Sequence, residues 1–296
     1  MAQASEITAL AEGITCVRCN NPSPLTGPGT NTFLVGLAEI AVIDPGPDDP
    51  DHLDAILAAV PPDAKVTKVL VTHSHLDHSP NARPLSERTG APVYAFGPDG
   101  SGRSTAMKTL ASTVNLGGGE GRDTDFAPNI TLADGEDVPQ DGALIRAHWT
   151  PGHYGNHTAY QWGDVAFSGD LVMGWATTLI SPPDGDVSDF IASCERLKSL
   201  SLRALHAAHG APILDPAHRL QELIDHRRAR EAEILTGLQA KPLTPADLAA
   251  AIYKNTPKHL WPAAQRNVFA HLIDLTHRGL VDSCGTFAAN ARFTLR

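Results

Sequence analysis

The side chains best suited to chemistry lie in the short run 72–78, whose sequence is Thr-His-Ser-His-Leu-Asp-His. The run follows three apolar residues, 69–71, that predict a buried strand, so we expect a loop at the carboxyl end of that strand. Imidazoles and a carboxylate packed this closely are costly to bury unless they coordinate or pair with something. The motif therefore predicts a catalytic metal site, which needs several nitrogen or oxygen ligands and an open position for water. Its candidate ligands are His73, His75, Asp77 and His78.

Three more candidate ligands each follow an apolar or small-residue segment and stand at a turn. His153 ends the sequence Thr-Pro-Gly-His, in which proline and glycine favour a tight turn. Asp170 follows a serine and a glycine, and His209 follows two alanines. Three short strands that end in these residues predict the carboxyl edge of a sheet, where α/β proteins often carry their active sites.

In this order, the motifs resemble those of the metallo-β-lactamase superfamily, and the resemblance covers residues 5–240. Residues 21–24 with 27–32, 43–46, and 209–213 leading into 226–231 are similar to one branch of it, which carries a carboxyl-terminal winged helix. That branch includes the mitochondrial β-lactamase-like endoribonuclease and many bacterial hydrolases. The resemblance implies an α/β fold, a four-layer αβ/βα sandwich of two mixed sheets, with a small winged-helix-like domain at the end of the chain.

The resemblance also implies two metal ions. It places His73, His75 and His153 on one ion and Asp77, His78 and His209 on the other, with Asp170 bridging both. These nitrogen and oxygen donors suit zinc and leave iron and manganese open. Two ions close together can hold a hydroxide and polarise the scissile group, while Asp77 orients the nucleophile and carries its proton. Asp44, in an Asp-Pro-Gly turn, is expected to orient a ligand histidine instead of binding metal itself.

Other residues are expected at the mouth of the site. Tyr154 stands where members of that family usually carry a small hydroxyl residue, and Asn156 where they carry a small or acidic one, so we expect both to affect the choice of substrate. His157 either supports the structure or contacts substrate. Lys254, beside Tyr253, either holds a carboxylate or phosphate of a small substrate or lies on a surface loop.

Composition limits the domain organisation and the partners. The 296 residues, 42% of them hydrophobic, are enough for one large domain and a small one, which we place at 1–240 and 241–296. A net charge of −10 weighs against a nonspecific grip on a nucleic-acid backbone, which needs a basic face. The cluster 226–230, which holds three arginines, is expected to be a solvated helix face. A small molecule is therefore the expected partner, and a homodimer is left open.

Location follows from weaker signals. No stretch is long and apolar enough to span a bilayer, and residues 1–6 lack the basic and apolar regions of a signal peptide. Cys16 and Cys19 form a Cys-x-x-Cys pair without a second pair, so we expect reduced thiols and no metal there. The expected location is the cytoplasm.

The elements that must position these residues are predicted from periodicity and turn residues. Residues 97–125 lack strong periodicity and predict a mobile lid or a surface insertion. Thr244, Pro245 and Asp247 predict the start of a helix, as cap, first and third residue. The predicted strand pairs lie before residues 22–29 and over 33–43, with a further strand over 92–96. The predicted helices are 50–60, 79–89, 187–200, 215–238, 245–253, one from Pro257 and 262–278, followed by a two-stranded wing over 280–295.

The predicted activity is hydrolysis by a metal-bound hydroxide that attacks a carbonyl or phosphoryl centre. A small thioester, ester, lactone or lactam is the leading substrate class, because the chain is acidic and has no basic tract. An endoribonuclease or phosphodiesterase is the enzymatic alternative, on the resemblance to the winged-helix branch. A non-catalytic metal-bound protein that works through its winged helix is the third, and the intact ligand set argues against it. The third helix of the tail has only Arg266 and Arg278 as fixed positive charges, which favours a wall or partner-binding module over base readout.

Overall fold

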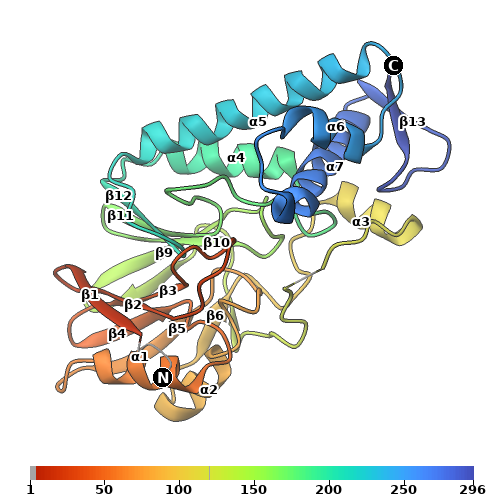
Figure 1. Cartoon of the computed structure of the whole chain (residues 1–296). Coiled ribbons are helices and arrows are strands. Elements are labelled where there is room, and N and C mark those ends of the chain that lie inside the picture. The colour runs from red at the N-terminus through yellow and green to blue at the C-terminus, as the bar shows by residue number, and fades with distance from the viewer. Residues whose placement is uncertain (1–4, 120) are drawn as a thin grey trace.

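Two β-sheets packed face to face form the centre of the molecule (Figure 1). The computed structural model describes residues 5–119 and 121–296, so residues 1–4, which contribute to the predicted location, lie outside the described residues. The first sheet has seven strands in chain order: β1 (Glu6–Ala11), β2 (Ile14–Arg18), β3 (Asn31–Val35), β4 (Glu39–Ile43), β5 (Lys65–Leu70), β6 (Val93–Ala95) and β7 (Ile130–Thr131). The second has five in the order β12 (Ala204–Ala207), β11 (Val165–Gly169), β10 (Thr158–Trp162), β9 (Ala143–Trp149) and β8 (Asp137–Gln140).

Helices cover the outer face of each sheet. Helices α1 (Pro50–Ala59) and α2 (Ala82–Thr89) pack on the first sheet, and α4 (Val187–Lys198) and α5 (Pro216–Leu238) pack on the second (Figure 1). One apolar cluster lies between the sheets and joins Phe33 and Leu70 to Tyr160 and Phe167. Both sheets mix parallel and antiparallel pairs. The predicted four-layer sandwich is confirmed, since each sheet buries one face against the other sheet and one against helices.

Local sequence explains where the helices begin. The Asp49 side chain accepts hydrogen bonds from the backbone amides of residues 51 and 52, and Pro50 starts α1. Asp215 and Pro216 begin α5 in the same way. Such a cap contributes about 1 kcal/mol to a helix, because it satisfies amides that have no partner inside the helix.

Two predicted segments differ from the structure. The helix expected over 79–89 begins at Ala82 instead, because Ser79 belongs to the loop before it, where its hydroxyl donates to the His75 carbonyl oxygen and to Asp123. Residues 97–125, predicted to lack regular structure, contain α3 (Thr105–Thr113), which Ser104 caps. The described part of this segment is tied to the 72–78 loop, since Asp123 N donates to Ser74 O.

The tail forms a small unit beside one end of the sandwich. Its helices are α6 (Pro245–Ile252), the short 3-10 helix η1 (Lys258–Leu260) and α7 (Trp261–His277), and its wing is the antiparallel pair β13 (Val281–Cys284) and β14 (Arg292–Leu295). The predicted cap of α6 is confirmed, with Thr244 and Asp247 bonded reciprocally. The helix expected from Pro257 is the 3-10 turn that leads into α7. Helix α5 runs from the sandwich to the tail, and its end shares an apolar cluster with α7 and α3 (Figure 1).

No helix among the described residues is long and apolar enough to cross a membrane. Arg227, on α5, corrects the expectation of a solvated basic cluster over 226–230. Its side chain is only 1% exposed, and its guanidinium lies 5.0 Å from the centre of the Phe190 ring. It packs between α4 and α5 because its polar end finds partners in the segment after β11, described below.

Candidate metal centre

The predicted ligands meet at one edge shared by both sheets. Residues 73–78 follow β5 of the first sheet, whereas His153, Asp170 and His209 follow β9, β11 and β12 of the second. The sequence indicated one sheet edge, and the structure shows that two sheets contribute. Loops at this edge can bring side chains together that are far apart in the chain, while the strands behind them stay rigid.

Two glycines explain the local turns that aim these side chains. At Gly152 (φ +137°) a Cβ atom would lie 2.3 Å from the Phe190 Cα, so no other residue fits before His153. At Gly169 (φ +49°) a Cβ atom would lie 2.5 Å from His157 Nε2. The pairing of β11 with β12 also shifts register there, and such a bulge redirects the next side chain, Asp170.

The first donor group comprises His73, His75, His153 and Asp170, whose ligand atoms lie within 4.8 Å of one another. His73 Nε2 lies 2.9 Å from His75 Nδ1, and His153 Nε2 lies 3.2 Å from the same atom. Three imidazole nitrogens therefore face one point, where a divalent ion would accept electron pairs from all of them.

The second donor group comprises Asp77, His78 and His209. Asp77 Oδ2 lies 3.3 Å from His209 Nε2 and 3.5 Å from His78 Nε2. Asp170 stands between the groups. Its Oδ1 lies 3.2 Å from His209 Nε2, and its Oδ2 lies 3.7 Å from His153 Nε2, so one oxygen faces each group.

The residues present fit two divalent ions. His78 Nε2 and Asp170 Oδ1 are buried and have no hydrogen-bond partner among the described residues, an arrangement that is costly unless an ion binds them. In four of the histidines, Nδ1 faces away from the donor group and contacts an oxygen atom. Such a contact fixes the tautomer that leaves Nε2 free for a metal. These contacts are His73 Nδ1 with Thr72 Oγ1 (3.0 Å), His78 Nδ1 with Asp44 Oδ2 (2.9 Å), His153 Nδ1 with Leu179 O (2.7 Å) and His209 Nδ1 with Gly29 O (3.2 Å).

Asp44 lies behind the ligands, where the sequence placed it. It is 1% exposed, and its Oδ1 accepts from the Thr72 amide at 2.7 Å while its Oδ2 contacts His78. Its φ of +50° is in the left-handed region, which is unfavourable for a residue with a Cβ. Strain of this kind is retained where the side chain is needed in one place, and here the Asp44 carboxylate joins Thr72 to His78, the two ends of the 72–78 loop.

Electrostatics differ between the two groups. Burial and the neighbouring His153 lower the pKa of His75 to about 3. Burial disfavours the charged form of His209 as well, but Asp170 and Asp77 outweigh it and raise the pKa of that imidazole to about 10. The pKa of His78 is likewise raised, because the carboxylates of Asp77, Asp170 and Asp44 surround its buried ring.

A pocket opens above the two groups. Tyr154 lines it, with its ring centre 4.6 Å from that of His75. Asn156 was expected at the mouth of the site, but it does not line the pocket. It is 1% exposed, and its amide nitrogen donates to Ser74 Oγ and to Gly97 O, so it ties the 72–78 loop to the segment after β6.

His157 and Lys254 also lie outside this pocket lining. His157 is buried behind His73, and its Nδ1 lies 2.9 Å from Thr150 Oγ1. This supports the structural interpretation of His157 over substrate contact. Lys254 is exposed, and its neighbour Tyr253 lines the pocket instead.

Sequence reasoning missed a polar cluster that supports the first donor group. Arg122 binds Asp99 and donates to the Tyr154 hydroxyl at 2.9 Å, and Asp99 accepts from Ser74 Oγ at 3.0 Å. Burial raises the pKa of the Tyr154 hydroxyl well above its usual value, an effect that Asp184 reinforces, so the phenol stays protonated. No periodic signal marks Asp99 and Arg122, which lie in the Gly- and Ser-rich segment 97–125 that predicted only a lid or insertion.

Comparisons with known proteins agree with this geometry. A family model described as the metallo-beta-lactamase superfamily matches residues 25–209, and one described as the beta-lactamase associated winged helix domain matches residues 244–288. A beta-lactamase-like protein 2 homolog of Drosophila melanogaster is 29% identical over 291 residues, which cover 94% of this chain and 93% of that protein. An atrochrysone carboxyl ACP thioesterase of Aspergillus fumigatus is 30% identical over 244 residues, which cover 79% and 67%. A metallo-beta-lactamase family protein of Thermus thermophilus, solved by crystallography, has a TM-score of 0.75 at 26% identity and covers 97% of this chain and 100% of its own.

Proposed function

Because the chain belongs to the metallo-beta-lactamase superfamily, we propose that it is a dinuclear zinc hydrolase that acts on a small thioester, ester, lactone or lactam with an apolar body. The two donor groups supply the places for the ions. The pocket above them supplies the argument for the substrate. A thioester leads this class, and the thioesterase among the relatives supports that choice.

The observation that carries the proposal is the lining of this pocket. Its volume is about 400 Å³, in the range of small-molecule sites. None of the described residues that line it is Lys or Arg, so the wall offers no cationic side chain to a phosphodiester. Apolar residues from three parts of the chain dominate the wall instead: Leu25, then Met173, Trp175 and Leu179, and from the tail Leu260, Ala263 and Ala264.

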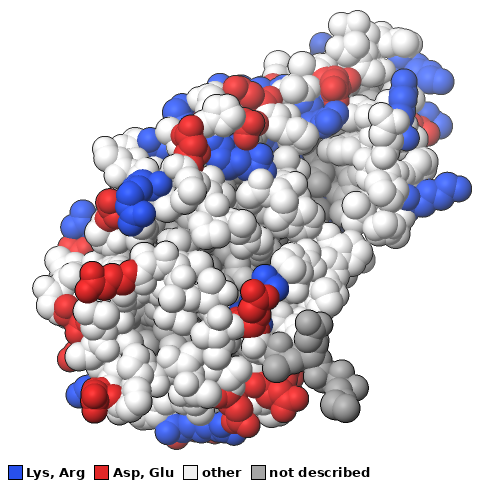
Figure 2. All heavy atoms as spheres, turned by 60° about the vertical axis from the view of Figure 1, so that its left-hand side comes forward, with Lys and Arg blue, Asp and Glu red and all other residues white. Residues whose placement is uncertain are grey.

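Surface charge supports the same substrate class. On the face shown in Figure 2, Lys and Arg alternate with Asp and Glu around the rim, and the middle of the face carries few charges. A protein that grips RNA needs a continuous basic surface, because most of the affinity comes from phosphate contacts. The net charge of −10 adds to this argument.

The chain's own residues have distinct roles in this reaction. Two bound divalent ions would lower the pKa of water and polarise the scissile carbonyl. Burial opposes the charged form of Asp77, but His78 and His209 lower the pKa of its carboxyl, so Asp77 is ionised at neutral pH and can accept a proton from the attacking water. Asp77 also lines the pocket, so it reaches the reacting atoms. Trp175 and Leu25 at the rim exclude water from an apolar acyl group.

Zinc is the proposed ion because five of the seven candidate ligands are imidazoles and the other two are carboxylates, a ligand set that suits zinc. Elemental analysis of the purified protein tests this choice, and the expected result is about two zinc ions per chain. Iron or manganese in their place would show that zinc is not the metal. The proposed location is the cytoplasm, and it is supported by four free cysteines.

A turnover screen tests the substrate class. The panel contains acyl thioesters of increasing chain length, lactones, β-lactams, a bis-aryl phosphodiester and single-stranded RNA, each measured at several ionic strengths. We expect kcat/KM to rise with acyl length and to depend weakly on salt. Efficient RNA cleavage with a steep salt dependence and no small-molecule turnover would overturn the proposal and establish a nuclease.

Trp175→Ala tests whether the rim of the pocket binds the acyl group of the substrate. The indole is 49% exposed at the rim and belongs to neither donor group. We expect kcat/KM to fall for long acyl groups and to stay unchanged for an acetyl group, because only a long chain reaches the rim. An equal loss for both would show that Trp175 acts on the centre and not on the acyl group.

A further inference from the structure

The segment between β11 and α4 holds one of the candidate ligands from behind. Leu179 O lies 2.7 Å from His153 Nδ1, and Thr178 Oγ1 lies 3.2 Å from the same nitrogen. A carbonyl oxygen can only accept, so Nδ1 carries the proton and donates it. His153 Nε2 is then left without a proton, facing His75. The position of this segment therefore decides both the tautomer and the aim of His153.

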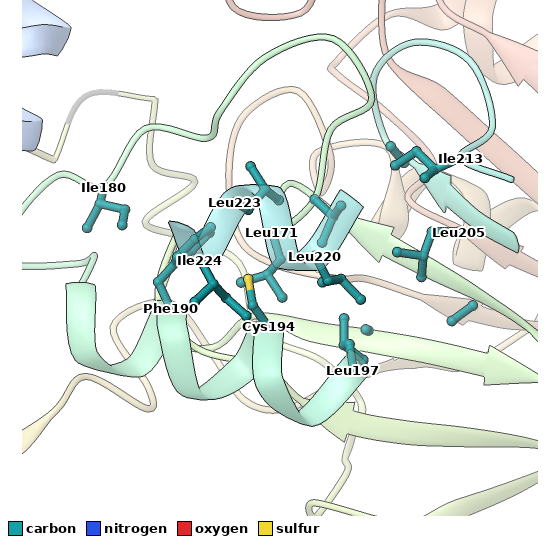
Figure 3. Close-up of a cluster of buried hydrophobic side chains, with 14 of the residues drawn as sticks. Leu171, Ile180, Phe190, Cys194, Leu197, Leu205, Ile213, Leu220, Leu223 and Ile224 are labelled. Atoms are coloured by element: carbon teal, nitrogen blue, oxygen red, sulfur yellow. The ribbon is translucent and has the colours of Figure 1, made fainter. Parts of the chain in front are cut away.

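The other side of the segment is held by two side chains from distant helices. The Ile180 amide donates a hydrogen bond of 3.0 Å to Oδ1 of Asn267, which lies on α7 of the tail. Arg227, on α5, donates to Thr178 O and also, at 3.2 Å, to the same oxygen of Asn267. Ile180 itself is buried in the apolar cluster with Phe190 and Ile224 (Figure 3). Both residues that flank Leu179 are thus fixed by contacts with α5 and α7.

Arg227 makes this arrangement unusual. A fully buried guanidinium is costly, and it is commonly balanced by a carboxylate. The hydrogen-bond partners described for Arg227 are neutral oxygens, of Thr178 and Asn267. Arg266, next to Asn267 in the tail, also contacts this segment, because its guanidinium donates a hydrogen bond of 2.9 Å to Ser181 Oγ. Hydrogen bonds of Arg227, on α5, and of Asn267 and Arg266, on α7, therefore converge on the short segment that supports His153.

We propose that the tail serves the metal centre through Asn267, a positioning residue that keeps Thr178 to Ile180 in place and so aims His153 at its ion. The winged helix then supports the hydrolytic site as a structural brace and has no need of nucleic acid. The proposal rests on the metal centre of the proposed function and does not depend on its substrate. It also explains why an amide side chain stands at 267: its oxygen accepts two donors at once, which an apolar residue cannot do.

Three variants in zinc-binding experiments test this inference. Asn267→Leu removes the acceptor, Asn267→Asp keeps it, and Gln265→Leu changes the same helix two residues away. Zinc content after dialysis and zinc affinity in competition with a chelator are measured for each, with circular dichroism as the check on folding. We expect Asn267→Leu to weaken one of the two ions by about 10- to 100-fold, the usual effect of losing a group that orients a ligand. Asn267→Asp and Gln265→Leu should bind both ions as wild type does.

The outcomes separate this inference from the proposed function. If Asn267→Leu folds and binds both ions with wild-type affinity, the inference is wrong while the hydrolase stands. If the wild type itself binds no second ion, the dinuclear centre of the proposed function is wrong. Asn267→Ser, whose shorter side chain cannot reach both donors, replaces the leucine variant if that one does not fold, with the same expected loss. In a His153→Ala background, Asn267→Leu should weaken zinc binding no further, because the two residues act on one ion; an additional loss would contradict the route through His153.

Discussion

The two donor groups share Asp170, yet they are held by different kinds of neighbour. The histidines of the first group are supported by neutral oxygens, such as the Thr72 hydroxyl and the Leu179 carbonyl. In the second group, carboxylate oxygens lie within 3.6 Å of both His78 and His209, although Nδ1 of His209 also faces a neutral oxygen, the Gly29 carbonyl. The histidines of two neighbouring donor groups therefore have opposite electrostatic surroundings.

This difference in pKa affects how each donor group would bind its ion. The lowered pKa values leave His73 and His75 neutral at neutral pH, so an ion can bind the first group without displacing their protons. The raised pKa values leave His78 and His209 protonated until an ion arrives, so binding at the second group releases protons. We therefore expect ion binding to depend strongly on pH at the second group and weakly at the first.

The largest expected effect is that of Asp77→Asn, which lowers kcat by about 10²-fold or more, because one change removes both a proton acceptor and a ligand. The ion of the first group should remain bound, since Asp77 belongs to the second. Steady-state kinetics and zinc content are measured together. Near wild-type turnover with full metal content would show that Asp77 does not carry the proton.

Asp44→Asn should lower turnover and the affinity of the second ion by about 10- to 100-fold, because the amide no longer accepts the proton of His78 as a carboxylate does. Asp48→Asn is the matched control, since it makes the same chemical change at a residue of the same turn that lies outside the donor groups. Calorimetric zinc titration distinguishes the two variants. Equal affinities for Asp44→Asn and Asp48→Asn would remove Asp44 from the support of the second group.

A pH series sharpens the comparison of the groups. The pKa of His209 is raised to about 10 and that of His78 is also raised, so at neutral pH the ion must displace their protons, and its affinity should increase at least about tenfold per pH unit between pH 7 and 9. The pKa of His75 is lowered to about 3, so the affinity of the first ion should be nearly constant over the same range. Competition with a chelator at each pH gives both slopes. Identical slopes for the two ions would contradict the electrostatic difference between the groups.

The smallest effect is expected for Lys254→Ala, outside both groups. Its ammonium is exposed, and one exposed charge contributes at most about 1 kcal/mol, so kcat/KM on the best small substrate should change by less than about fivefold. The dependence of kcat/KM on ionic strength should stay weak in both proteins. A large loss with a steep salt slope would mean that Lys254 grips a charged substrate and that the pocket extends over it.

Some of these features could be predicted because they depend on neighbouring residues in the chain. The run 72–78 places four donors within seven residues after a strand, and turns with glycine aim His153 and Asp170. The capping box at Thr244 follows from the same kind of local rule. Asp44, in its Asp-Pro-Gly turn, was expected to orient a ligand histidine, and in the structure the parallel pairing of β4 with β5 brings that turn next to the 72–78 loop.

Residue burial, in contrast, was decided by segments that are distant in the chain. Arg227 reads as a surface residue among other arginines, but it is buried because Thr178, 49 residues away, supplies a carbonyl oxygen. Asn267 has no sequence signal at all, and its partner Ile180 lies 87 residues away. Lys254 and His157 are equally polar in the sequence, yet one is exposed and the other is enclosed by the sheets. Local sequence determined which donors this protein has and the turns that present them, whereas only tertiary packing decided what surrounds each donor, because burial and charge compensation depend on contacts between elements that no short pattern records.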